Sequence, residues 1–151
     1  AFLGLFPLEQ ESLDYWLTAL RVNVAAPAAL TRLALPLLKA SPDASVIYVS
    51  ETHGHAATAY WGGFSVSKHA GAFWADIAAK EWDTIPDLRI NTLIPGPVQS
   101  PQRTKTHPGE EKTSLPAADS LLPSFLYLLG PDSKGVSGKS FDCVNPLTSV
   151  N

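Results

Sequence analysis

The chain has 151 residues, of which 45% are hydrophobic and 17% charged, and this composition is typical of a folded globular domain. A net charge of −3 and a pI of about 5.7 leave no dominant basic face, so we expect no nucleic-acid partner. Arg, Lys or Pro interrupts each long apolar segment, so no membrane span is predicted. The single cysteine, Cys143, excludes an internal disulfide and favours a reducing, cytoplasmic location.

The first forty residues predict helices. In the segment 12–20, Ser12 can cap the helix start, and leucine and tryptophan side chains recur on one face. A second apolar stripe runs over 30–37. Because Pro27 and Pro36 fall within this second helix, we expect it to be kinked or broken.

The remainder of the chain alternates between strand and helix patterns. Short runs rich in β-branched and aromatic residues predict three strands, the first two buried on both faces: 45–50, 88–94 and 140–144. Helical patterns occupy 62–82 and 117–129, the latter weakened by a proline, and the polar stretch 99–114 predicts a long mobile loop. The resulting order α-β-α-β-α-β predicts an α/β layer fold with a parallel sheet.

Four segments together resemble the short-chain dehydrogenase/reductase family: 22-VNV-24, 46-VIYVS-50, the S-x-S-K motif at 65–68, and 91-NTLIPGPVQS-100. The resemblance implies a doubly wound, Rossmann-like sheet that binds NAD or NADP and acts on a carbonyl or alcohol substrate. The family's glycine-rich turn and its ribose-reading residue have no match in this sequence. We therefore expect residues 1–151 to be a fragment, the C-terminal portion of a single such domain without its N-terminal dinucleotide-binding half. By itself the fragment should bind no cofactor.

The resemblance also assigns four catalytic positions. Asn23 matches the family's Asn, and Lys68 matches the Lys that binds the nicotinamide ribose and lowers the pKa of a tyrosine. Phe64 stands where the family has that tyrosine, one helical turn before Lys68. Glu51 stands where the family has Ser. Two alternatives remain open: Asn23 as a helix-kink residue bonded to its own backbone, and Lys68 as a solvated surface lysine.

Both departures oppose the family's usual chemistry. Phenylalanine has no proton to give, and general acid–base catalysis contributes roughly 10²–10⁴ in rate. An ionised Glu51 accepts hydrogen bonds rather than donating them, so it would repel a developing alkoxide or pair with Lys68. Ser50 could take the serine role if the loop slips by one residue. Tyr60 is a poor substitute for the phenol, because it lies one turn away in a loop.

Three functions follow from these departures. The first is an NAD(P)-dependent oxidoreductase whose usual activity is weak or lost. The second is a non-catalytic, dimerising or regulatory pseudoenzyme. The third is an active enzyme whose acid–base groups have moved to Glu51 with His53 or His55.

The segment 95-PGPVQS-100 resembles the family's P-G-x-V-x-T motif, which contacts the nicotinamide. The implied cofactor-binding residues are Pro95, Gly96, Val98 and Ser100, together with Lys68. The alternative is that Pro-Gly-Pro simply ends a strand.

Two further expectations concern metals and partners. The His53-Gly54-His55 sequence makes a poor ligand set, since only Glu51 lies near the two histidines, and we predict no metal site. The resemblance implies a homodimer through the two long helices. Cys143 should be a small buried hydrophobic residue in the third strand.

Overall fold

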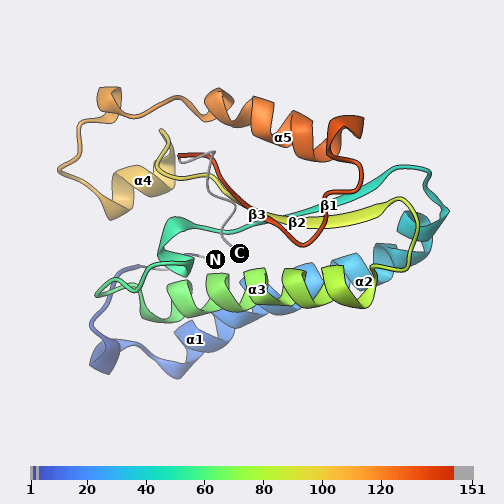
Figure 1. Cartoon of the computed structure of the whole chain (residues 1–151). Coiled ribbons are helices and arrows are strands. Elements are labelled where there is room, and N and C mark those ends of the chain that lie inside the picture. Colours follow the sequence, from blue (N-terminus) through green and yellow to red (C-terminus); the bar gives the residue numbers. More distant parts are fainter. Residues whose placement is uncertain (1, 3, 145–151) are drawn as a thin grey trace.

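A computed structural model describes residues 2 and 4–144 of the chain and shows an α/β arrangement. Its sheet has three parallel strands in the order β1-β2-β3: β1 (Ala44–Val49), β2 (Leu88–Ile94) and β3 (Ser140–Asp142). Helices cover both faces of this sheet (Figure 1). The predicted α/β fold with a parallel sheet is confirmed.

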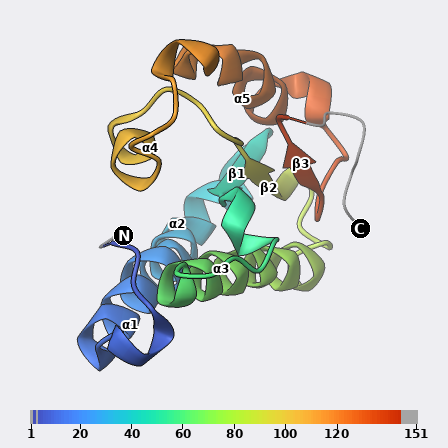
Figure 2. The same cartoon turned by 90° about the vertical axis from the view of Figure 1, so that its left-hand side faces the viewer.

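The helices form two layers around the sheet. Their bounds are α1 (Leu13–Leu20), α2 (Ala26–Ala40), α3 (Gly62–Glu81), α4 (Pro101–Thr106) and α5 (Leu122–Leu129). Helices α1, α2 and α3 lie on one face and α5 on the other, as both views show (Figures 1 and 2). Helix α4 and the first turn of α3 lie toward the same end of the sheet (Figure 1).

Strand β2 is the buried centre of the sheet. Apart from its first residue it is buried throughout, as the sequence predicts. The prediction that the first strand is buried on both faces is wrong, since only Ala44 and Tyr48 of β1 are buried and Val49 is 39% exposed. The reason is that β1 pairs with one neighbour only and forms an edge of the described sheet.

Helix α1 begins where the sequence predicts, because the Ser12 hydroxyl accepts the Tyr15 N–H at 3.1 Å. Its leucine stripe does not face the core of this chain. Leu13 and Leu17 are 72% and 48% exposed, whereas Tyr15 and Ala19 are buried. Small and aromatic side chains therefore make the contact with α3, and the leucines form an outer apolar face.

The break in the first long helix lies directly before Pro27. A π-helical segment, Arg21–Ala25, joins α1 to α2 around the buried Asn23. Pro27 is the second residue of α2 and has no N–H to offer the carbonyls of this π-helical turn, and Pro36 is accommodated within the helix. The predicted interruption is therefore a π-turn at the asparagine, directly before Pro27.

The second half of the chain departs from prediction at its loops. The stretch 99–114 is not wholly a loop, because it contains α4. The third helix is preceded by a 3₁₀ segment, Ala118–Leu121, which leaves Pro123 in the first turn of α5. Strand β3 ends at Asp142, so Cys143 lies just beyond it, half-buried rather than buried.

Helix α3 approaches the sheet closely through small side chains. A run of alanines on α3 packs against Tyr48 of β1 and Ile90 of β2. Closest approach is at Gly71, where an added Cβ would overlap the Tyr48 hydroxyl and lie 2.7 Å from the Asn23 carbonyl. This close packing brings the loops after the strands next to the start of α3.

Among the helices of the described residues, none combines the length and the apolar character needed to cross a membrane.

Candidate functional site

The carboxyl ends of β1 and β2 create a cavity at one edge of the sheet. Register pairs Val49 with Leu93, so the loops that follow these strands begin side by side. In open α/β sheets, ligands bind outside the carboxyl ends of the strands. The cavity measures about 200 Å³ and is lined by Phe2, Asn23, Ser50, Glu51, Phe64, Lys68 and Gln102. The structure thus brings together all four catalytic positions that the sequence singled out.

Asn23 ties three elements together beneath this cavity. Its Nδ2 donates to Ser67 Oγ on α3 at 2.9 Å, and its backbone carbonyl accepts the Tyr48 hydroxyl of β1 at 2.8 Å. Burial raises the pKa of Tyr48 to about 12, so the phenol stays protonated and remains a donor. The buried hydrogen bonds fix the π-turn against α3 and β1.

Lys68 is half-buried rather than a solvated surface lysine. Its Nζ donates to the Val49 carbonyl at 2.9 Å and lies 5.7 Å from the centre of the Tyr48 ring. Burial lowers the pKa of Lys68, and the Glu51 carboxylate opposes that shift. The amine is therefore held at the end of β1, beside the cavity.

Phe64 fills the place of the expected phenol with an apolar wall. It is 3% exposed and contacts Phe2 edge-to-face, with ring centres 5.3 Å apart, and Trp61 at 5.8 Å. Tyr60 does not compensate, because it is 59% exposed and is not among the residues lining the cavity. No tyrosine is found among the described residues of the lining.

Glu51 pairs with His53 rather than with Lys68, so the pairing suggested from sequence is wrong. Its carboxylate accepts the His53 backbone N–H at 2.6 Å and lies 2.9 Å from His53 Nδ1. The His53 ring in turn stacks on Trp61, with ring centres 3.7 Å apart and planes 5° apart. The carboxylate, which lines the cavity, and the imidazole, which does not, form a dyad.

Ser50 also lines the cavity, next to Glu51. It is 3% exposed, and its Oγ lies 3.1 Å from Nε2 of His55. Sequence reasoning considered Ser50 as a stand-in for the family's serine but missed its histidine partner. The signal in the sequence is a hydroxyl and an imidazole on either side of a short turn.

The Pro-Gly-Pro segment after β2 borders a second cavity of about 280 Å³, which shares Glu51 and Gln102 with the first. Gly96 has a φ of +72°, which a side chain would strain. The backbone N–H of Val98 has no hydrogen-bond partner among the described residues. Hydrogen-bond donors of this kind, the Val98 N–H beside the second cavity and the Lys68 amine beside the first, are of the chemical type that the amide and hydroxyl groups of a nicotinamide riboside need. Ser100 accepts the Arg103 N–H at 3.0 Å and caps α4.

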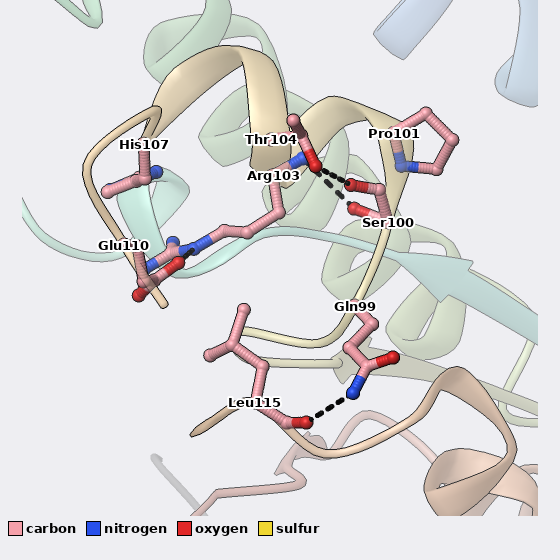
Figure 3. Close-up of a pocket in the computed structure, with 8 residues that line it drawn as sticks. All are labelled: Gln99, Ser100, Pro101, Arg103, Thr104, His107, Glu110 and Leu115. Atoms are coloured by element: carbon pink, nitrogen blue, oxygen red, sulfur yellow. Dashed lines mark hydrogen bonds and ion pairs between the residues drawn. The ribbon is translucent and has the colours of Figure 1, made fainter. Parts of the chain in front are cut away.

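A third hollow, of about 280 Å³, lies within the segment predicted to be a mobile loop (Figure 3). Here the Arg103 guanidinium pairs with both oxygens of Glu110, at 2.6 and 2.7 Å. Gln99 donates to the Leu115 carbonyl at 2.8 Å, which closes the segment (Figure 3). These bonds give the segment a defined shape. The Ser100-Pro101 pair, a cap followed by a proline, could have predicted α4.

The two histidines of the His-Gly-His sequence have different partners, Glu51 for His53 and Ser50 for His55. Within the part of the chain that the structure describes, no group of three or more His, Cys, Asp or Glu side chains could hold a metal ion.

The family follows from comparison with known proteins. The family model for short chain dehydrogenase matches residues 3–111. The curated oxidoreductase YciK of Escherichia coli K12, itself described as uncharacterized, is 31% identical over 136 residues, which are 90% of this chain and 53% of YciK. The chain belongs to the short chain dehydrogenase family and spans about half the length of this relative.

Solved structures of the family superpose closely on the fold. A short chain dehydrogenase from Pseudomonas syringae has a TM-score of 0.89 at 35% identity, covering 95% of this chain and 58% of that one. One from Escherichia coli CFT073, complexed with NADPH, has a TM-score of 0.87 at 30% identity, covering 93% and 57%. The three strands described here therefore correspond to part of a larger Rossmann-type sheet.

Proposed function

We propose that the complete domain containing this sequence is an NAD(P)-dependent oxidoreductase for a carbonyl or alcohol substrate, in which the usual tyrosine-driven turnover is weak or lost. The observation that carries this proposal is one cavity at the carboxyl edge of the sheet, where Lys68 and Asn23 keep the family pattern and Phe64 lacks the phenol.

When bound, the dinucleotide would supply or remove a hydride at its nicotinamide ring. Lys68 would donate hydrogen bonds to the ribose hydroxyls, since its amine is already held at the end of β1. The Val98 N–H would bind the nicotinamide carboxamide. Phe64 and Phe2 would exclude water from one side of the substrate. The relative complexed with NADPH supports NADP as the cofactor to test first.

Cofactor binding is tested by titrating the longest natural chain that contains this sequence with NADPH and with NADH. Energy transfer from tryptophan to the reduced nicotinamide reports binding, and Trp61 borders the second cavity. We expect NADPH to bind, and Lys68→Met to weaken it by about 10-fold, as expected for loss of a charged hydrogen bond. Silence with both cofactors would overturn the proposal.

A dimerising role is the second candidate, and exposed apolar faces favour it. Large apolar side chains at least 46% exposed cover the outer faces of α1, α2 and α3: Leu13, Leu17, Leu30, Leu33, Leu37, Phe73 and Ile77. Single exposed leucines are ordinary, but a contiguous apolar patch marks an interaction surface. We propose that a homodimer forms through these helices.

Sedimentation of the same chain tests the dimer. Phe73→Glu should convert a dimer to a monomer, because a buried interfacial carboxylate would be unpaired. Leu8→Glu serves as the control, because Leu8 is 67% exposed in a 3₁₀ segment outside these faces. A monomer in the unmodified protein would exclude this role.

A further inference from the structure

Among the described residues that line the first cavity, Ser50 alone carries a hydroxyl. In that lining Phe64 has replaced the expected phenol, and Glu51 presents a carboxylate already paired with His53. A reaction that makes or breaks an alcohol needs a group that can give a proton to the substrate oxygen. Two donors of the lining are held at the ends of the strands: Ser50 follows β1 directly, and the Lys68 amine donates to the Val49 carbonyl.

Hydrogen bonds of the backbone and of a neighbouring turn hold Ser50 in place. The Ser50 backbone N–H donates to the Leu93 carbonyl at 2.8 Å, which extends the β1–β2 ladder by one bond. A Cβ added to Gly54 would lie 3.3 Å from Ser50 Oγ and 3.0 Å from Lys68 Cβ. Because Gly54 has no side chain, the Ser50 hydroxyl and the Lys68 side chain can both pack closely against it. His69 Nδ1, 2.8 Å from the Gly54 carbonyl, fixes that turn to α3.

His55 connects this hydroxyl to solvent. Its Nε2 lies 3.1 Å from Ser50 Oγ, while the residue as a whole is exposed. Partial burial lowers the pKa of His55, and the nearby His69 lowers it further. Acidic side chains from three neighbouring segments oppose the shift: Glu51 on the loop, Asp76 on α3 and Asp142 on β3. The imidazole can therefore exchange protons with water at one end and with Ser50 at the other.

We propose that Ser50 and His55 form a proton relay that serves the substrate oxygen in place of the missing phenol. In reduction, a bound nicotinamide cofactor would supply the hydride to the carbonyl carbon and would itself be oxidised. The carbonyl oxygen takes the Ser50 proton, and His55 Nε2–H returns a proton to Ser50 Oγ. As its Nε2 gives up that proton, His55 takes a proton from water at Nδ1, and alcohol oxidation runs through the same steps in reverse. This relay rests on the proposed oxidoreductase function.

The Glu51–His53 dyad is less suited to this task. The Glu51 carboxylate accepts the backbone N–H and the ring of His53, so it faces the substrate as an acceptor. His53 is not among the residues lining the cavity, and its ring is stacked on Trp61. The Ser50 hydroxyl, in contrast, can give a proton to the substrate and receive one from His55 together, so that no charged side chain has to form beside the substrate.

The kinetic test uses Ser50→Ala and His55→Gln in the longest natural chain, with reduction of a generic aldehyde by NADPH as the assay. Each variant should lower the residual turnover by about 10-fold or more, while NADPH affinity stays the same. The plot of turnover against pH should also lose the part that follows the titration of His55. Thr52→Ala is the matched control, since this exposed hydroxyl in the same turn makes no side-chain hydrogen bond within the described residues. Its turnover should equal that of the unmodified protein.

Restoring the phenol sharpens the test. In a Phe64→Tyr background the tyrosine supplies the proton, so His55→Gln should change turnover by less than about 3-fold. An equal loss in both backgrounds would show that His55 acts on structure rather than on proton supply, and would overturn the relay. Because His55 is exposed, this variant should fold normally.

A readout independent of turnover comes from NMR titration of the His55 Cε1–H signal. Ser50→Ala should move the His55 midpoint, because the hydrogen bond to its Nε2 is removed, whereas Thr52→Ala should not. An unmoved midpoint in Ser50→Ala would overturn the relay. Failure to bind NADPH would overturn the oxidoreductase proposal itself, whereas intact binding without turnover, or with turnover indifferent to His55, would overturn the relay alone.

Discussion

The two sides of the first cavity are built in different ways. On one side, buried hydrogen bonds join Asn23 to Ser67 of α3 and to Tyr48 of β1, which lies behind the lining, and Lys68 donates to the Val49 carbonyl at the end of β1. On the other side, Phe64 and Glu51 are held by ring contacts and by a histidine on the same loop. Bonds of the first kind hold elements of the fold together, whereas those of the second can be exchanged without disturbing the sheet.

In the proposed function, the framework that would hold a cofactor is therefore separate from the groups that would supply a proton. The hydrogen bonds of the framework would leave unsatisfied buried groups if one partner were lost, which costs about 1–3 kcal/mol each. A phenol replaced by a phenyl ring leaves no such group, because Phe64 gains ring contacts instead. Chemistry can therefore change at Phe64 and Glu51 while the architecture persists.

The largest expected effect comes from changing Phe64 and Glu51, the side of the cavity where the chemistry departs from the family. Phe64→Tyr combined with Glu51→Ser restores the family's donor and its neutral hydrogen-bonding partner. Turnover of a generic carbonyl with NADPH should rise by roughly 10²–10⁴. Phe64→Leu with the same Glu51 change is the control and should show no such gain. Equal rates in the two double variants would mean that these positions do not face the substrate.

A smaller effect is expected on the framework side. In Gly71→Ala the added methyl group would collide with the Tyr48 hydroxyl and the Asn23 carbonyl. Overpacking of this kind should lower the free energy of unfolding by about 1–3 kcal/mol in a urea titration. Gly109→Ala, where an added Cβ meets nothing within 4 Å, should leave stability nearly unchanged. If both variants were equally stable, the tight contact between α3 and β1 would be wrong.

The smallest effect appears only in alkaline solution. The pKa of Tyr48 is raised from 10.0 to about 12 by burial, so the folded state keeps a proton that the unfolded state loses. The stabilisation from Tyr48 is therefore complete below pH 10.0 and is lost as the pH rises toward about 12. Relative to Tyr48→Phe, the free energy of unfolding should fall by about 1 kcal/mol between about pH 9 and about pH 11. Parallel pH profiles of the two proteins would contradict the burial of this phenol.

The sequence by itself predicted the alternation of strands and long helices and the buried central strand. Local patterns suffice for these, since Ser12 caps a helix and β-branched runs make strands. The four candidate catalytic positions came from the resemblance to the family, not from a local pattern.

Only the tertiary structure decided which groups meet. The partial burial of β1 and the outward position of the α1 leucines depend on contacts between segments far apart in the sequence. The histidine partners of Glu51 and Ser50 depend on the path of the loop after β1. Hydrophobic periodicity reports that a helix has an apolar face, but it does not report what that face contacts. The position of the helix interruption at Asn23 also depends on tertiary contacts, because the hydrogen bonds of Asn23 reach α3 and β1, which lie far from it in the sequence.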